Sequence, residues 1–192
     1  GGDDIARALS ERLGLKCYNK TVLNKIAEHA EVDGALMTTL HEQVSRSSDA
    51  WLYSLIFGKN VTRDDYTRFL VTTVRGLYWT GGIVLGRGGH IILAGRDVLR
   101  VRIIGSLEAC AKRIAHQDHI DLAKAKKKVR ESNRRRGEFI WEVFRSRLND
   151  PMNFDLVINT DHFADYSHVV DLIMGALHSM GLDKPQTGTT NK

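Results

Sequence analysis

Residues 82–90 read GIVLGRGGH, a short apolar run that leads directly into glycines around a single arginine, Arg87. The run is too short for a long helix and glycine bounds it on both sides, so it predicts a buried strand. In an open parallel sheet, ligands bind at the carboxyl ends of the strands, where glycine lets them approach the backbone. Arg87 is therefore the first candidate ligand residue, because its planar guanidinium suits phosphate. An ordinary tight turn with a surface arginine is the alternative that this motif alone leaves open.

Strand patterns alternate with helical patterns through the rest of the chain. Strand-like runs lie near residues 15–18, 83–86, 99–105 and 155–159, and apolar stripes at helical spacing separate them. This alternation predicts an α/β fold whose parallel sheet carries helices on both faces. Residues 31–60 show no strand pattern and predict a helical insert, which a helix starting near residue 62 continues.

The size and composition of the chain limit the classes of protein to which it can belong. Its 192 residues predict a single domain over residues 1–182, followed by a disordered polar tail over residues 183–192. The two cysteines, Cys17 and Cys110, form no disulfide framework and indicate a cytoplasmic protein, and no apolar run approaches the length of a membrane span. The net charge of +5 favours an anionic partner, which a nucleotide, a nucleic acid or a membrane surface could provide.

Two further regions suggest contact with phosphate. Gly1 and Gly2 lead into a helix, and a glycine-rich approach to a helix N-terminus is a common way to build a phosphate site, although Asp3 also suits any first helical turn. The helical stripe of residues 121–148 is interrupted by a basic segment, which phosphate-binding arginines explain better than a solvated face does. Gly137 could supply a hinge there. A nucleic-acid patch over residues 124–136 is the weaker alternative, because no aromatic residue is interleaved with the charges.

Three motifs resemble the cytidylate kinase-like family, within the P-loop nucleoside monophosphate (NMP) kinases. They are GGxxIA at residues 1–6 followed by LG, VLGRG at residues 84–88, and FDLVINT at residues 154–160. The resemblance implies a three-layer, parallel-sheet P-loop kinase-like fold with an N-terminal phosphate loop, whose strand would lie upstream of Gly1. It also implies a helical NMP-binding insert over residues 31–80 and an arginine-bearing lid over residues 113–137.

The activity that the resemblance implies is transfer of the ATP γ-phosphoryl group to CMP, dCMP or a related acceptor, with Mg²⁺. By resemblance, the residues that bind ATP are Gly1, Gly2 and Asp3, and Asp3 also reaches the metal ion. The residues that bind the acceptor are Asn19, Arg87 and Gly88. The catalytic residues, which neutralise phosphate charge, are Arg87, Arg113, Arg135 and Arg136. We expect small nucleotides as partners, and neither a membrane nor a nucleic acid.

Several positions depart from the pattern of this family. Gly2 and Asp3 stand where the phosphate loop usually has lysine and a hydroxyl residue, and Asn19 and Asn133 stand where aspartate is usual. Many relatives carry lid arginines at the positions of Cys110 and Gln117. Replacing aspartate by asparagine keeps a hydrogen-bonding group but loses the negative charge. These departures favour a second hypothesis, in which the same fold serves as a non-catalytic nucleotide-binding module with a sensor or assembly role.

Overall fold

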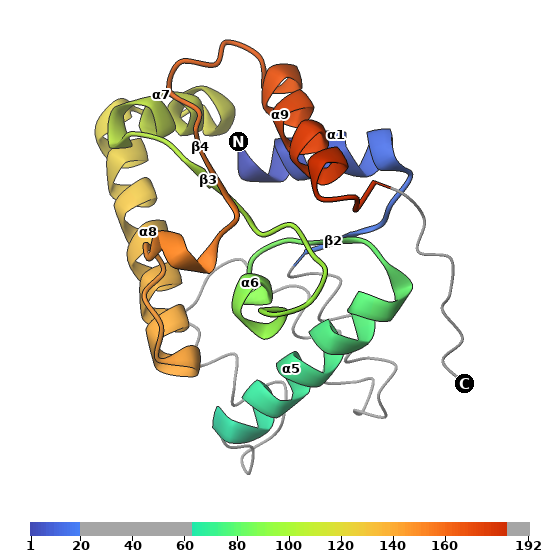
Figure 1. Ribbon diagram of the computed structural model, residues 1–192. Helices are drawn as coiled ribbons and strands as arrows, with labels where there is room; N and C mark the ends of the chain where they lie inside the picture. The colour runs from blue at the N-terminus through green and yellow to red at the C-terminus, as the bar shows by residue number, and fades with distance from the viewer. Residues whose placement is uncertain (20–62, 184–192) are drawn as a thin grey trace, which may run out of the picture. The chain divides into compact units, whose positions relative to one another are not determined.

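The structure is a computed structural model that describes residues 1–19 and 63–183 (Figure 1). The chain divides into two compact units, the first made of residues 1–15 and 93–192 and the second of residues 16–92. The insert predicted over residues 31–60 and all but the first residue of the predicted tail lie outside the described residues. In the described part of the chain, no helix is both long and apolar enough to cross a membrane.

The first unit contains a parallel pair of strands, β3 (Val101–Ile104) and β4 (Leu156–Asn159). Ile104 pairs with Asn159, so both strands end at the same edge. The chain between them forms α7 (Leu107–Asp118), α8 (Leu122–Phe144) and the short 3₁₀ helix η1 (Pro151–Asn153). The strands predicted near residues 99–105 and 155–159, and their parallel arrangement, are confirmed.

Helices α7 and α8 pack against each other around small apolar residues, Ala111, Ala125 and Val129. Each helix begins at a side-chain cap: the Ser106 hydroxyl accepts the amide of Ala109 at 3.2 Å, and the Asp121 carboxylate accepts that of Lys124 at 2.8 Å. Helix α8 continues without interruption through Gly137, so the hinge considered there from the sequence does not appear as a break in the helix. Packing of the residues on both sides of the glycine outweighs its weak helix propensity.

Helices α1 (Gly2–Leu13) and α9 (Tyr166–Ser179) lie side by side in the first unit (Figure 1). Their buried faces are apolar, and Arg12 of α1 pairs with Asp171 of α9 at the surface. Gly14 ends α1 with a φ of 64°, a left-handed conformation that glycine adopts without steric cost. The buried residues are Ile5, Ala6 and Leu9 on α1, and Val169, Val170 and Ile173 on α9.

The second unit contains the other parallel pair, β1 (Cys17–Tyr18) and β2 (Ile83–Val84), which the amide of Leu85 extends by donating to the Tyr18 carbonyl at 3.0 Å. Helix α5 (Arg63–Thr80) precedes β2 and the single-turn α6 (Gly89–Ile92) follows it. The strands predicted near residues 15–18 and 83–86 are therefore confirmed. Helix α5 forms the last part of the insert predicted over residues 31–80.

A partly exposed ion pair holds the start of the β3–β4 pair. The Asp155 carboxylate accepts hydrogen bonds from the Arg100 amide at 2.8 Å and from the guanidinium at 3.0 Å and 2.6 Å. Both side chains are about three-quarters buried, with relative exposures of 23% and 26%. The hydrogen bonds from the Arg100 side chain are the main reason that the pKa of Asp155 lies below its ordinary value.

Replacing Asp155 with alanine is expected to lower the free energy of unfolding at pH 7 by about 1–2 kcal/mol, because three charge-assisted hydrogen bonds at a partly exposed position are lost. Since the folded-state pKa is depressed, this stabilisation is present above the unfolded pKa and is lost as the pH falls through the folded pKa. The difference between the wild type and the variant in denaturant titrations should therefore shrink below about pH 4. Asp171→Ala, which breaks an exposed pair, should cost less than about 1 kcal/mol; equal losses would contradict the assignment.

Candidate functional site

The carboxyl ends of β3 and β4 carry a group of polar residues. Ser106 follows β3, and Thr160 and Asp161 follow β4. The Asp161 carboxylate accepts the Ser106 amide with both oxygens, at 2.8 Å and 3.1 Å. This backbone hydrogen bond is the main reason that the pKa of Asp161 lies below its ordinary value, and the charge of Arg113 adds to the effect. Asp161 is thus an anion at neutral pH.

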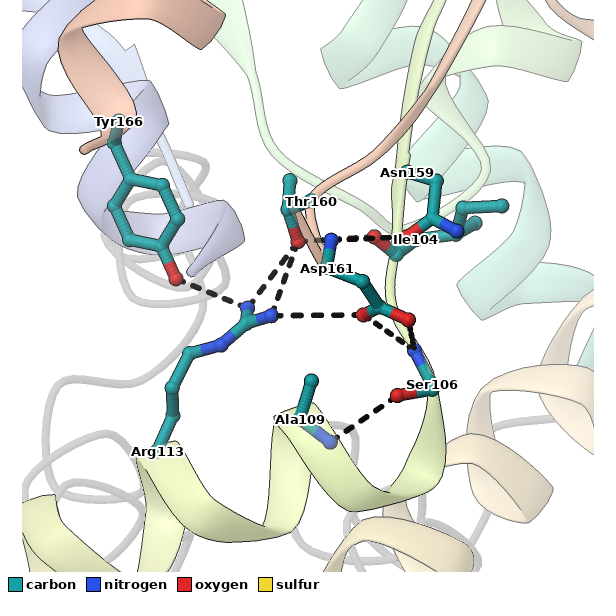
Figure 2. A network of polar contacts seen from close by, with 8 residues as sticks. All are labelled: Ile104, Ser106, Ala109, Arg113, Asn159, Thr160, Asp161 and Tyr166. Carbon is teal, nitrogen blue, oxygen red and sulfur yellow. Dashed lines mark hydrogen bonds and ion pairs between the residues drawn. The ribbon is translucent and has the colours of Figure 1, made fainter. Parts of the chain in front are cut away.

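Arg113, on α7, reaches into this group with its guanidinium (Figure 2). Its Nη1 donates to the hydroxyl oxygens of Thr160 at 3.2 Å and Tyr166 at 3.0 Å, and its Nη2 donates to Thr160 at 3.2 Å. Thr160, only 2% exposed, in turn donates its proton to the Ile104 carbonyl at 3.0 Å. The guanidinium also lies 5.9 Å from the centre of the Tyr166 ring. Two hydroxyl groups and an aromatic ring therefore fix its orientation.

The same guanidinium packs against the beginning of α1. A Cβ atom built on Gly1 would overlap Tyr166 Oη and lie 3.1 Å from Arg113 Nη1, so both side chains touch the backbone there. Gly1 is the N-cap of α1, and no side chain among residues 1–19 and 63–183 caps this helix. Side chains do cap α7, α8 and α9. We call the group the Arg113 network; its members are Gly1, Ser106, Arg113, Thr160, Asp161 and Tyr166.

At the Arg113 network, a guanidinium meets the N-terminus of α1, beside the carboxylate of Asp161. The first backbone amides of a helix carry partial positive charge, and a cation beside them is repelled rather than stabilised. Arg113 is held there by two neutral hydroxyls, while the nearest carboxylate oxygen, on Asp161, lies 3.9 Å away and is already bonded to Ser106. An anion bound at the first amides of α1, within reach of the guanidinium, would interact favourably with both.

A second group lies in the second unit, at the carboxyl edge of β1 and β2. Asn19 follows β1 directly and is exposed. The residues after β2 are Gly86, Arg87 and Gly88, with φ angles of 76°, 51° and 74°. Because Tyr18 pairs with Val84, Asn19 and this segment leave the sheet at the same edge. We call residues 86–88 the Arg87 loop. The structure therefore brings the predicted acceptor residues Asn19, Arg87 and Gly88 to one edge.

Arg87 is held in a strained backbone conformation. Three described residues other than glycine have a positive φ, and two of them, His119 and Arg145, are C-caps of α7 and α8, where a left-handed residue ends the helix. Arg87 ends no helix; it lies between a strand and α6, in a region that costs a side chain about 1–2 kcal/mol. Strain of this kind often accompanies a functional position.

The arginines predicted in the lid do not all contact the same residues. Arg113 belongs to the Arg113 network, whereas Arg135 and Arg136 lie exposed on α8. Arg135 approaches Glu131 at 3.9 Å, and Arg136 donates to Asn133 at 3.0 Å. Both contacts lie within α8, so the structure unites Gly1 with Arg113 but shows no contact that joins either residue to Arg135 or Arg136 among the described residues.

Asp3, the predicted metal ligand, lies exposed in the first turn of α1, after Gly2. Within residues 1–19 and 63–183, no three acidic, histidine or cysteine residues cluster as a metal site would require. A lone carboxylate suits a Mg²⁺ ion that substrate phosphates and water hold for the most part, and does not suit an ion held by protein alone. Asp3 therefore fits Mg²⁺ only in the presence of a phosphate ligand.

Four members of the Arg113 network were not recognised as functional from the sequence: Ser106, which was expected only to cap a helix, Thr160, Asp161 and Tyr166. Thr160 and Asp161 carry a usable signal, because polar residues directly after a parallel strand stand where ligands bind. Tyr166 gives no such signal, since its spacing places it with the apolar residues of α9, and its hydroxyl meets Arg113, 53 residues earlier.

Comparison with solved structures supports the α/β class. A structure described as an uncharacterized protein from Eubacterium ventriosum ATCC 27560 is similar, with a TM-score of 0.69 and 17% sequence identity over 93% of this chain and 92% of that one. At this identity, the likeness shows the fold alone.

Comparison with protein families goes further. The model of the cytidylate kinase-like family matches residues 1–162, and the chain belongs to this family. It is thus a nucleotide kinase-like protein, as the three sequence motifs predict. No curated protein matches the chain.

Proposed function

We propose that this protein is an ATP-dependent nucleoside monophosphate kinase, which transfers the γ-phosphoryl group of ATP to CMP, dCMP or a related acceptor. Membership of the cytidylate kinase-like family supports the class of reaction. The observation that carries the proposal is the Arg113 network, where a fixed guanidinium lies against the uncapped start of α1. Phosphoryl transfer depends on such preorganised positive charge more than on covalent chemistry.

The start of α1 supplies the proposed ATP site. The amides of Gly2 and Asp3 belong to the first turn, which has no intrahelical acceptors for them, and can donate to phosphate oxygens as in a P-loop. Mg²⁺ would neutralise phosphate charge when bound, and Asp3 is the carboxylate placed to contact it directly or through water. Arg113 would contact the same phosphates from α7. Arg135 and Arg136 would approach from α8, the lid of this proposal.

The Arg87 loop supplies the proposed acceptor site. Gly86 and Gly88 flank Arg87 and leave the backbone open, and Asn19 lies at the same edge as a hydrogen-bonding group for the acceptor. The strained φ of Arg87 is explained if the loop is selected to present its guanidinium rather than for stability.

Arg87→Ala is expected to raise the Kd for the acceptor monophosphate by about tenfold, because a charge-assisted bond to phosphate is lost. Arg87→Gly should lower affinity equally, and should unfold about 1 kcal/mol less readily than the alanine variant, because glycine adopts a φ of 51° freely. Calorimetric titration and denaturant unfolding measure the two effects. Wild-type affinity in the glycine variant would show that the loop backbone, and not the cation, binds the acceptor.

The proposed reaction is tested with the full-length protein, ATP, Mg²⁺ and a panel of nucleoside monophosphates, by following the formation of ADP and diphosphate products. Transfer that is fastest to CMP or dCMP is the expected result. No transfer to any acceptor would overturn the kinase proposal.

A non-catalytic nucleotide-binding module is the second candidate function. It is favoured by Cys110, whose Sγ lies near Gly105 beside Asp161 and Arg113, at a position where many members of the family carry a lid arginine. Gly2, Asn19 and Asn133 likewise remove charges that the family pattern contains. Nucleotide binding that is indifferent to Mg²⁺ and gives no product would favour this candidate over the kinase.

A further inference from the structure

We infer that Tyr166 is a positioning residue that holds Arg113 against the start of α1 and thereby sets the affinity of the protein for the phosphates of ATP. This inference rests on the proposed ATP site at α1. It concerns a residue of α9, outside the phosphate loop and outside the lid arginines that the sequence motifs indicate.

The hydrogen-bonding pattern around Arg113 assigns this role. Thr160 accepts from both terminal nitrogens of the guanidinium, and its own proton goes to the Ile104 carbonyl, so the geometry of β3 and β4 fixes one side of the fork. Tyr166 accepts from Nη1 at 3.0 Å and fixes the second side (Figure 2). Without this second acceptor, the guanidinium can turn about its contact with Thr160.

The position of the phenol relative to Gly1 explains why orientation matters. The Tyr166 ring touches the Gly1 backbone closely enough that a Cβ there would lie 2.9 Å from Cζ. The hydroxyl therefore lies beside both the guanidinium and Gly1, the first residue of the site where α1 would bind phosphate. Tyr166 thus links α9, α7 and the start of α1.

Removal of the hydroxyl alone provides the test. Tyr166→Phe keeps the ring and its contact with the guanidinium, and should raise the Kd for ATP about five- to tenfold, with little change in melting temperature. Ser167→Ala is the matched control, because it removes a hydroxyl from the same first turn of α9, where that group contacts Asp165. The control should bind ATP with wild-type affinity.

A double-mutant cycle separates positioning from a purely structural role. If Tyr166 acts through Arg113, the fold-increase in the Kd for ATP of the double variant should be smaller than the product of the fold-increases of Tyr166→Phe and Arg113→Lys. The double variant should bind ATP about as weakly as Arg113→Lys alone. Independent effects, or wild-type affinity in Tyr166→Phe, would overturn the inference. So would the absence of ATP binding by the wild-type protein.

The readout by binding also distinguishes this inference from the proposed function. Coupled loss of ATP affinity in a protein that transfers no phosphoryl group would overturn the kinase proposal and would support the positioning role. Efficient phosphoryl transfer by the wild-type protein, together with independent effects of the two substitutions on ATP affinity, would support the kinase proposal and overturn the positioning role.

Discussion

Arg113→Ala is expected to lower kcat/KM for phosphoryl transfer by about 100-fold. The substitution removes the guanidinium held against the start of α1 by Thr160 and Tyr166. Preorganised donors of this kind contribute most where negative charge develops in the transition state, and losing one typically costs about two to three orders of magnitude in rate. Steady-state kinetics with ATP and the preferred acceptor measure the loss.

Two further variants make the Arg113 result specific. Arg113→Lys keeps the charge but loses the planar fork, and should recover only part of the rate, because lysine cannot bridge Thr160 and Tyr166 in the same way. Lys112→Ala removes an exposed cation from the neighbouring position on α7 and should leave the kinetics unchanged. Full activity in Arg113→Ala, or equal losses in Arg113→Ala and Lys112→Ala, would contradict the role assigned to the guanidinium.

Gly82→Ala is expected to lower the free energy of unfolding by about 3 kcal/mol or more. Gly82 has a φ of 141°, and an added Cβ would overlap the Tyr18 ring and lie 2.9 Å from the Lys16 carbonyl oxygen. Backbone strain and a clash with backbone both contribute, and a carbonyl in the β1–β2 pair cannot move away cheaply. Chemical denaturation followed by circular dichroism measures the loss.

The neighbouring glycine supplies the control for this prediction. Gly81 also has a positive φ, 71°, but a Cβ there would meet no atom within 4 Å. Gly81→Ala should therefore cost only the strain of a left-handed residue, about 1 kcal/mol. If both variants lose the same stability, the clash with Tyr18 and Lys16 is not the cause.

The sequence predicts the elements of the fold where local composition is decisive. Glycines on both sides of residues 83–85 confine β2 to a short strand, and Ser106 marks the start of α7 because its hydroxyl caps the helix. Local composition does not predict that helix α8 continues through Gly137. Its weak helix propensity is a local property, whereas the continuity of α8 depends on packing by buried residues such as Val129 and Phe139 on both sides.

The candidate site likewise contains residues whose proximity the sequence predicts and residues whose proximity it does not predict. Asn19 and Arg87 could be predicted to share an edge, because each follows a strand and parallel neighbours end together. The partnership of Arg113 with Tyr166 could not, since helical periodicity assigns a face of α9 to the core but does not say which distant side chain the face meets. The sequence also does not distinguish Arg113, which Thr160 and Tyr166 hold, from the arginines of α8, whose contacts described above lie within that helix.

The packing of α1 against α9 affects how the protein is made. The two helices are among the first and the last elements of the described chain, so α1 leaves the ribosome about 150 residues before its partner is synthesised. During that interval, the apolar side chains of Ile5 and Leu9 have no α9 to cover them, while residues 16–92 are already available to fold. The first unit can close only after α9 has been synthesised, so the apolar face of α1 stays uncovered until then.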